Sequence, residues 1–122
     1  MNQDIIITHK EDYIHVQCQG EYSLDKAKLC IDMILGACEG NDCPKAFVDL
    51  TKMETMFDEV EKVLIADHLR NKLLNTVEKL ALLATQTQFD PSRFFEMAAA
   101  NRGVHAKTFL DEYEALGWLK AG

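Results

Sequence analysis

The segment Lys45-Ala46-Phe47-Val48-Asp49-Leu50-Thr51-Lys52-Met53-Glu54-Thr55-Met56-Phe57 decides how the rest of the chain is interpreted. Its first part, residues 46–50, is largely apolar and predicts a buried strand. The part that follows predicts a loop, yet Met53, Met56 and Phe57 are apolar residues where a loop is normally polar. This loop is the first indication of where the function of the protein is located.

Strand and helix patterns alternate on both sides of this segment. Residues 5–9 and 13–19 predict two strands joined by a tight turn. In the second strand Ile14, Val16 and Cys18 alternate with polar side chains, which is typical of a strand with one buried face. The remaining predicted elements are helices at 23–40, 58–74, 90–103 and 111–119, and strands at 79–85 and 106–109.

Capping residues indicate where the helices begin and end. Ser23 is expected to cap the start of the first helix, and Gly40 to close it in a left-handed conformation. Asp90 followed by Pro91 predicts a helix start, because proline is favoured at the first helical position. Gly103 is expected to end that helix.

The predicted order is therefore ββαβαβαβα. A hairpin followed by strand–helix units predicts an α/β fold with a mixed sheet of about five strands, antiparallel at the hairpin and parallel afterwards. The alternation in the second strand indicates unequal coverage of the sheet, so the four helices are expected mainly on one face. The 122 residues suit a single domain over 1–122.

Composition limits the classes of partner. With 13 basic and 20 acidic residues the formal charge is −7, which opposes binding to nucleic acids and anionic membranes. No apolar run approaches the ~20 residues of a membrane span, and the first ten residues have no signal-peptide pattern. Cys18 and Cys30 occupy apolar positions and no CxxC pair occurs, so we expect reduced thiols in a cytoplasmic protein.

A series of short motifs runs through the chain from Ile5 to Leu119 in a characteristic order and spacing. They are Tyr13-Ile14-His15-Val16 leading to Gly20-Glu21, Phe47-Val48-Asp49-Leu50-Thr51, Ala99-Ala100-Asn101-Arg102-Gly103, and Phe109-Leu110-Asp111 followed by Ala115-Leu116-Gly117-Trp118-Leu119. The pattern resembles the STAS domain, named for sulphate transporters and anti-sigma-factor antagonists, and in particular its small free-standing SpoIIAA-like members. The resemblance implies a β/α fold of this type and a regulatory role without catalysis, in which the domain binds a protein or a small ligand.

The chain departs from the family at one place. Members that act as phosphorylation switches carry Ser or Thr in an Asp-Ser-Gly-like turn before the helix that follows this strand. Here the corresponding residues are Phe57-Asp58-Glu59-Val60, without a hydroxyl or a glycine, so a phosphorylation switch is not expected there. Asp58 and Glu59 instead place negative charge at a helix N-terminus, which the helix dipole favours by about 0.3–1 kcal/mol.

The apolar loop is the main candidate for a binding site. It follows the carboxyl end of a parallel strand, where open β/α folds bind ligands and partners. Exposed, its Met and Phe side chains would form a patch for a partner helix or an acyl-like ligand, and folded back they would plug the core. The predicted binding residues are Thr51, Met53, Thr55, Met56, Phe57, Asp58 and Lys62.

Other polar residues favour structural roles. Asp49 ends a strand, where a carboxylate can be catalytic or can accept backbone N–H bonds from the next loop. Arg102 is expected to bind an anion weakly or to complement a helix C-terminus. Asp67, His68 and Arg70 suit a charged helix face. The sequence contains no GxSxG, HExxH, P-loop or dinucleotide motif, so we predict no catalytic residue, cofactor or metal.

These features support three hypotheses. The first is a regulatory module that binds a protein partner through residues 51–57 and 58–62. The second is a carrier or sensor of a hydrophobic small molecule such as a lipid, with the loop as a lid over a pocket. The third is an enzyme that uses Asp49 with His68 or Arg102. A homodimer through the uncovered sheet face, which carries polar side chains, or through the hairpin edge is also left open.

Overall fold

A computed structural model of the chain describes residues 4–73 and 76–121. The elements are β1 (Ile5–His9), β2 (Ile14–Gly20), α1 (Leu24–Gly40), β3 (Lys45–Met53), α2 (Glu59–Leu73), β4 (Lys79–Leu83), α3 (Gln86–Ala100), β5 (Ala106–Phe109) and α4 (Glu112–Lys120). The predicted order of elements is confirmed, although the predicted helix end at Leu74 lies outside the described residues. Within the described part, no helix has both the length and the apolar character needed to cross a membrane.

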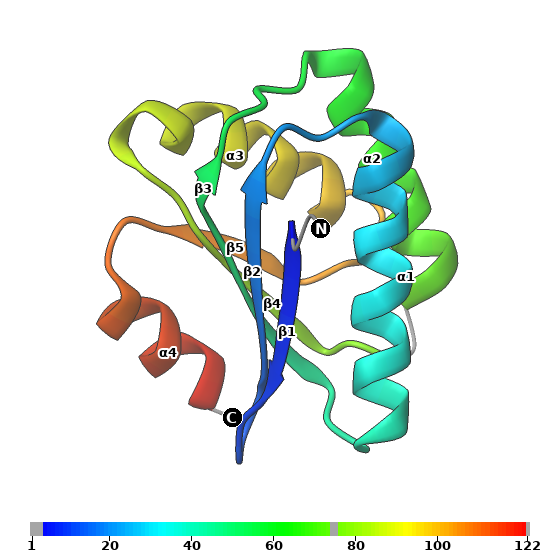
Figure 1. The fold of residues 1–122 in the computed structure, drawn as a ribbon, viewed down its shortest axis with the longest axis vertical. Coiled ribbons are helices and arrows are strands. Elements are labelled where there is room, and N and C mark those ends of the chain that lie inside the picture. Colours follow the sequence, from blue (N-terminus) through cyan, green and yellow to red (C-terminus); the bar gives the residue numbers. More distant parts are fainter. Residues whose placement is uncertain (1–3, 74–75, 122) are drawn as a thin grey trace.

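The strands form one mixed sheet in the order β1-β2-β3-β4-β5. The β1–β2 pair is antiparallel and the pairs that follow are parallel, as predicted. α1, α2 and α3 cover one face, whereas α4 lies on the opposite side of the sheet (Figure 1). The expectation that helices lie mainly on one face is therefore confirmed, with α4 as the exception.

Coverage on both sides explains why β4 is almost entirely apolar. Successive side chains of a strand point to opposite faces. Leu80 and Leu82 therefore pack in the larger core beneath α1–α3, whereas Ala81 and Leu83 pack in a smaller core beneath α4. That smaller core also contains Phe47, Phe109, Ala115 and Leu119.

The polar face of β2 is less open than the sequence suggests. Tyr13, His15 and Gln17 are half-buried. The rings of Tyr13 and His15 lie 6.2 Å and 5.3 Å from the ring of Phe47, which belongs to the α4 core. A homodimer through this face stays a prediction.

A β-bulge in β3 sets the direction of the side chains that follow. The register between β2 and β3 shifts, so that β3 contains one extra residue. The Asp49 carboxylate oxygen Oδ1 accepts hydrogen bonds from the backbone N–H of Thr51 at 2.9 Å and from its hydroxyl at 2.6 Å, which stabilises the bulge. Because side chains alternate along a strand, the extra residue brings Leu50 and Met53 to the same face, against the larger core.

The prediction for α1 is confirmed at its start and wrong at its end. The Ser23 hydroxyl accepts a hydrogen bond from a backbone N–H of the first turn, as expected of an N-cap. The left-handed conformation predicted for Gly40 is wrong, since Gly40 is the last helical residue and Asp42 has the positive φ of 51°. The backbone and side-chain amides of Asn41 both donate to the carbonyl of Ala37, which keeps the last turn helical through Gly40.

The predicted start of the third helix at Asp90-Pro91 is also wrong. α3 begins earlier, after the N-cap Thr85, and Pro91 lies inside the helix. Thr85 and Gln88 form a capping box, with Gln88 N donating to Thr85 Oγ1 at 3.2 Å and Thr85 N donating to Gln88 Oε1 at 2.9 Å. These reciprocal bonds start the helix one and a half turns before Pro91, which therefore removes one backbone donor inside the helix.

Candidate functional site

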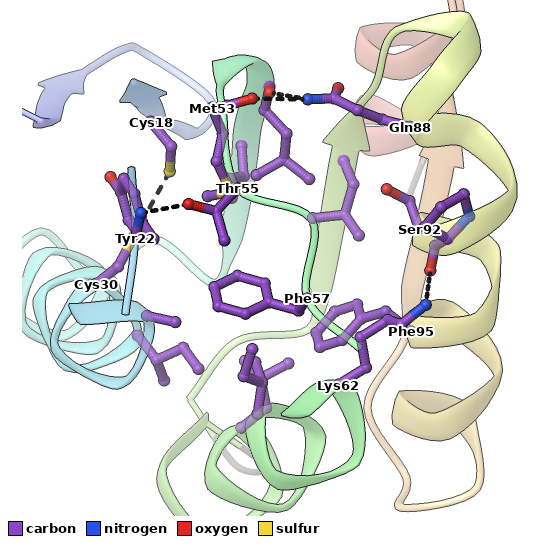
Figure 2. Close-up of a pocket in the computed structure, with 18 of the residues that line it drawn as sticks. Cys18, Tyr22, Cys30, Met53, Thr55, Phe57, Lys62, Gln88, Ser92 and Phe95 are labelled. Carbon is purple, nitrogen blue, oxygen red and sulfur yellow. Dashed lines mark hydrogen bonds between the residues drawn. The ribbon is translucent and has the colours of Figure 1, made fainter. Parts of the chain in front are cut away.

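An apolar cavity of about 140 Å³ lies between the sheet and the three helices α1, α2 and α3. The segment 54–58, which joins β3 to α2, contributes side chains to it and is called the lid below (Figure 2). The apolar wall includes Ile31, Ile34, Val48, Ile65, Leu82 and Phe95. An engineered apolar cavity of about 150 Å³ stays dry and binds benzene, so a cavity of this kind can hold an apolar ligand.

The apolar side chains of the predicted loop divide between the cavity and the solvent. Met53 and Phe57 are half-buried, pack against the larger core and line the cavity. Figure 2 shows Phe57 between the wall with Tyr22 and the wall with Phe95. Met56 also borders the cavity but is 49% exposed. Of the two arrangements that the sequence left open, Met56 has the exposed one, whereas Met53 and Phe57 are folded back against the core.

Thr55 attaches the lid to the start of α1. Its hydroxyl oxygen accepts a hydrogen bond from the backbone N–H of Tyr22 at 2.6 Å. The Tyr22 hydroxyl donates to the backbone carbonyl of Asp4 at 2.5 Å. Burial is the main cause that raises the pKa of the Tyr22 phenol above its usual range. Thr55 thus has a structural contact in addition to its place in the cavity wall.

Gln88 connects α3 to the carboxyl end of β3. Its side-chain Nε2 donates to the carbonyl of Leu50 at 2.7 Å and to the carbonyl of Met53 at 3.2 Å. The same side chain caps α3 through Thr85. The sequence interpretation missed Gln88, although the Thr85-x-x-Gln88 capping box was visible in the sequence and would have placed it at the start of a helix.

The other predicted binding residues have identifiable contacts. Thr51 donates to Asp49 at the bulge. Asp58 caps α2: its Oδ1 accepts from the Glu61 N–H at 2.8 Å, and its own N–H donates to Glu61 Oε1 at 3.0 Å. Lys62 lines the cavity from the first turn of α2. Asp58 therefore acts as a helix cap, as its place in the sequence favoured.

Two cysteines form part of the cavity wall. Cys18 of β2 and Cys30 of α1 are free thiols whose Sγ atoms lie 3.8 Å apart. The contact with Cys18, together with burial, raises the pKa of the Cys30 thiol. In Figure 2 the pair lies on the side of the cavity away from Lys62 and Ser92.

Asp49 and His68, which the enzyme hypothesis would use together, form hydrogen bonds with different partners. The Asp49 carboxylate accepts hydrogen bonds from the backbone N–H and the hydroxyl of Thr51. His68 Nε2 lies 3.0 Å from Asp32 Oδ1 on α1. Among the described residues no group of three or more potential ligands could hold a metal ion. Among the described residues, no hydrogen bond or ion pair joins Asp49 to His68.

Arg102 follows α3 and is engaged by the protein itself. Its Nε pairs with the carboxylate of Asp67, and its Nη1 donates to the carbonyl of Ala98 at 2.9 Å. Gly103 has a positive φ of 83°, which suits its predicted role in ending this segment, but the helix itself ends earlier, at Ala100, with Asn101 as its C-cap. Anion binding by Arg102 stays a prediction that this arrangement does not favour.

Comparison with known proteins identifies the fold. No family model and no curated protein matches the sequence. The structure is similar to the crystal structure of an uncharacterized protein of the DUF3478 family with a SpoIIAA-like fold from Shewanella loihica PV-4. The match covers 94% of this chain and 91% of that chain, with a TM-score of 0.58 and 19% sequence identity. This likeness concerns the fold, and the chain therefore has the SpoIIAA-like fold that its motifs predicted.

Proposed function

We propose that this chain is a small, cytoplasmic, non-catalytic module of STAS type that binds an apolar small molecule in the cavity under its lid. The observation that carries the proposal is the apolar cavity itself, which is bordered by the same Met53 and Phe57 that made the loop unusual in sequence. The SpoIIAA-like fold supports the assignment to the STAS type. The structural partners of Asp49 and His68 support a role without catalysis.

The apolar character of the cavity gives a physical reason for a ligand. A ligand that enters this space, which is partly open to solvent, removes its apolar lining from water. A ligand that fills this space makes contacts that the side chains alone do not make. Each methylene group transferred from water contributes about 0.8 kcal/mol, or a factor of about four in affinity.

A chain-length series of primary alcohols tests this proposal. We expect calorimetric affinity to rise about fourfold per methylene until the cavity is filled, and then to level off. Ala27 is buried and lines the cavity, so Ala27→Leu is expected to abolish binding without lowering thermal stability. Ala100→Leu is the matched control, because Ala100 is exposed at the end of α3.

Native mass spectrometry of protein isolated from cell extract provides a second test. Retention of an apolar molecule by the wild type and its loss in Ala27→Leu would support the cavity as the site. A bare mass together with an affinity that does not depend on chain length would refute the proposal.

A protein partner is the second candidate function, and exposed apolar side chains beside the lid favour it. Met56, Val60 and Leu64 are 49%, 69% and 40% exposed. They recur every four residues from the lid into α2, a spacing that puts Val60 and Leu64 on one helix face. Leu29 and Met33 of the neighbouring α1 are also exposed. Such a set of side chains is typical of an interaction surface.

A pair of variants tests this second function. Met56→Asp combined with Val60→Asp is expected to abolish co-purification of the partner while circular dichroism stays unchanged. Met97→Asp is the control, since Met97 is 62% exposed on α3 and does not line the cavity. A partner that is retained by the double variant, or lost equally in the control, would place the interaction elsewhere.

A further inference from the structure

Lys62 places an ammonium group at the edge of a largely apolar cavity. It lies in the first turn of α2, where the helix dipole disfavours a cation, so helix stability does not explain its position. Its Nζ donates to the carbonyl of Pro91 at 3.3 Å and lies 4.8 Å from the centre of the Phe94 ring. In the part of the chain that the structure describes, no carboxylate lies within 4.0 Å of this ammonium.

Of the three acidic residues within four positions before Lys62, Asp58 and Glu61 are already engaged, and the Glu59 carboxylate lies more than 4.0 Å from the Lys62 ammonium. Asp58 and Glu61 exchange hydrogen bonds with each other's backbone N–H groups at the start of α2. These bonds keep their carboxylates at the helix cap. The ammonium of Lys62 has three N–H donors and uses one of them on Pro91, so two remain for a ligand.

Ser92 adds a second donor on the same side of the cavity. Its side chain lines the cavity, and Figure 2 shows it on α3, beside the carbonyl to which Lys62 donates. None of the side-chain hydrogen bonds among the described residues involves the Ser92 hydroxyl. The side-chain amide of Gln88, by contrast, already donates to the carbonyls of Leu50 and Met53. The side of the cavity near α3 therefore offers donors and a positive charge.

From this arrangement we infer that the cavity takes an alkyl carboxylate. The carboxylate binds Lys62 Nζ and the Ser92 hydroxyl, because charge-assisted hydrogen bonds to an anion are the strong ones. The alkyl chain extends toward the opposite wall, where Cys18 and Cys30 lie. This inference rests on the proposed function, since it names the chemical class of the ligand for the same cavity.

The cavity volume sets the length of the chain. A benzene molecule fits an engineered cavity of about 150 Å³, so about 140 Å³ encloses on the order of six carbon atoms. A carboxylate of about eight carbons has an alkyl chain of about this volume. Octanoate and 1-octanol are then a matched pair of ligands that differ in the charge of the head group.

The experiment compares the two ligands by calorimetry in three proteins. We expect the wild type to bind octanoate at least about tenfold more tightly than 1-octanol, as a charged hydrogen bond predicts. In Lys62→Met this preference is lost, and 1-octanol affinity stays within about twofold. Lys52→Met changes the net charge equally at an exposed residue of β3 outside the cavity wall, and is expected to bind like the wild type. Thermal unfolding establishes that each variant is folded.

The possible results distinguish the carboxylate inference from the proposal that the cavity binds an apolar small molecule. Equal binding of octanoate and 1-octanol by the wild type, or unchanged octanoate binding by Lys62→Met, overturns the carboxylate inference and leaves apolar binding in place. Failure of both ligands to bind the folded wild type overturns the cavity as a ligand site altogether. An equal loss of octanoate affinity in Lys52→Met assigns the preference to net charge and overturns the role of Lys62.

Discussion

Single residues in this chain show how burial changes acid–base behaviour. Cys38 is buried in the larger core, and burial, followed by the nearby Cys43, raises the pKa of its thiol to about 12. The pKa values of Tyr22 and Cys30 are also raised, with burial among the causes. These groups remain neutral in the folded protein at pH values where they ionise in the unfolded chain.

Stability is therefore expected to fall at alkaline pH. A thiol whose pKa is raised on folding stabilises the native state fully below its unfolded pKa, near 9, and this contribution is lost as the pH rises toward 12. The slope is at most about 1.4 kcal/mol per pH unit for each such group. Urea unfolding at pH 8, 9, 10 and 11 under reducing conditions measures it. Cys38→Ala should lower the slope, and Cys43→Ala should lower it less, because burial is the larger of the two causes. Equal slopes in all three proteins would contradict the role of burial.

The helices and strands show which sequence patterns were sufficient to predict an element and its position. Period-two alternation placed β2, and continuous apolar character placed β4, because each pattern reflects which faces of the strand are covered. The start of α3 was misplaced because two local signals compete. Asp90-Pro91 is a common helix start, but the reciprocal bonds of Thr85 and Gln88 satisfy backbone groups earlier in the chain.

The bulge in β3 and much of the cavity wall could not be predicted in the same way. The bulge depends on how β3 pairs with β2, which is a contact between distant parts of the sequence. Ser92 and Phe95 reach the cavity because α3 packs beside α2, and no local pattern encodes that packing. The Met-rich loop was identified because its apolar residues are unusual in a loop, and Lys62 was included only as the end of the range 58–62 at the start of the predicted helix.

At the scale of the whole molecule, the sheet separates two cores of unequal size. The larger one contains the cavity and lies beneath α1–α3, and the smaller one is closed by α4 alone. Side chains of β3 and β4 point alternately into the two cores. If the helices on one face detach, apolar side chains of these strands become exposed, and the strands that support the other core are destabilised. This arrangement predicts that the chain unfolds as one domain.

Truncation of a fully buried side chain in α4 tests this unity. Leu119→Ala removes a side chain with 0% exposure and is expected to cost about 2–5 kcal/mol, a large part of the stability of a domain. Leu110→Ala, at a residue 48% exposed just before α4, is the control and should cost less than about 0.5 kcal/mol. Unfolding is followed by far-ultraviolet circular dichroism, which reports all the helices, and by the fluorescence of Trp118, which packs against the α4 core. We expect the two transitions to coincide in both variants, because the strands couple the layers. A fluorescence change that precedes the loss of helical signal in Leu119→Ala would show that α4 detaches by itself. The sheet with α1–α3 would then remain folded without α4, and unfolding as one domain would be wrong.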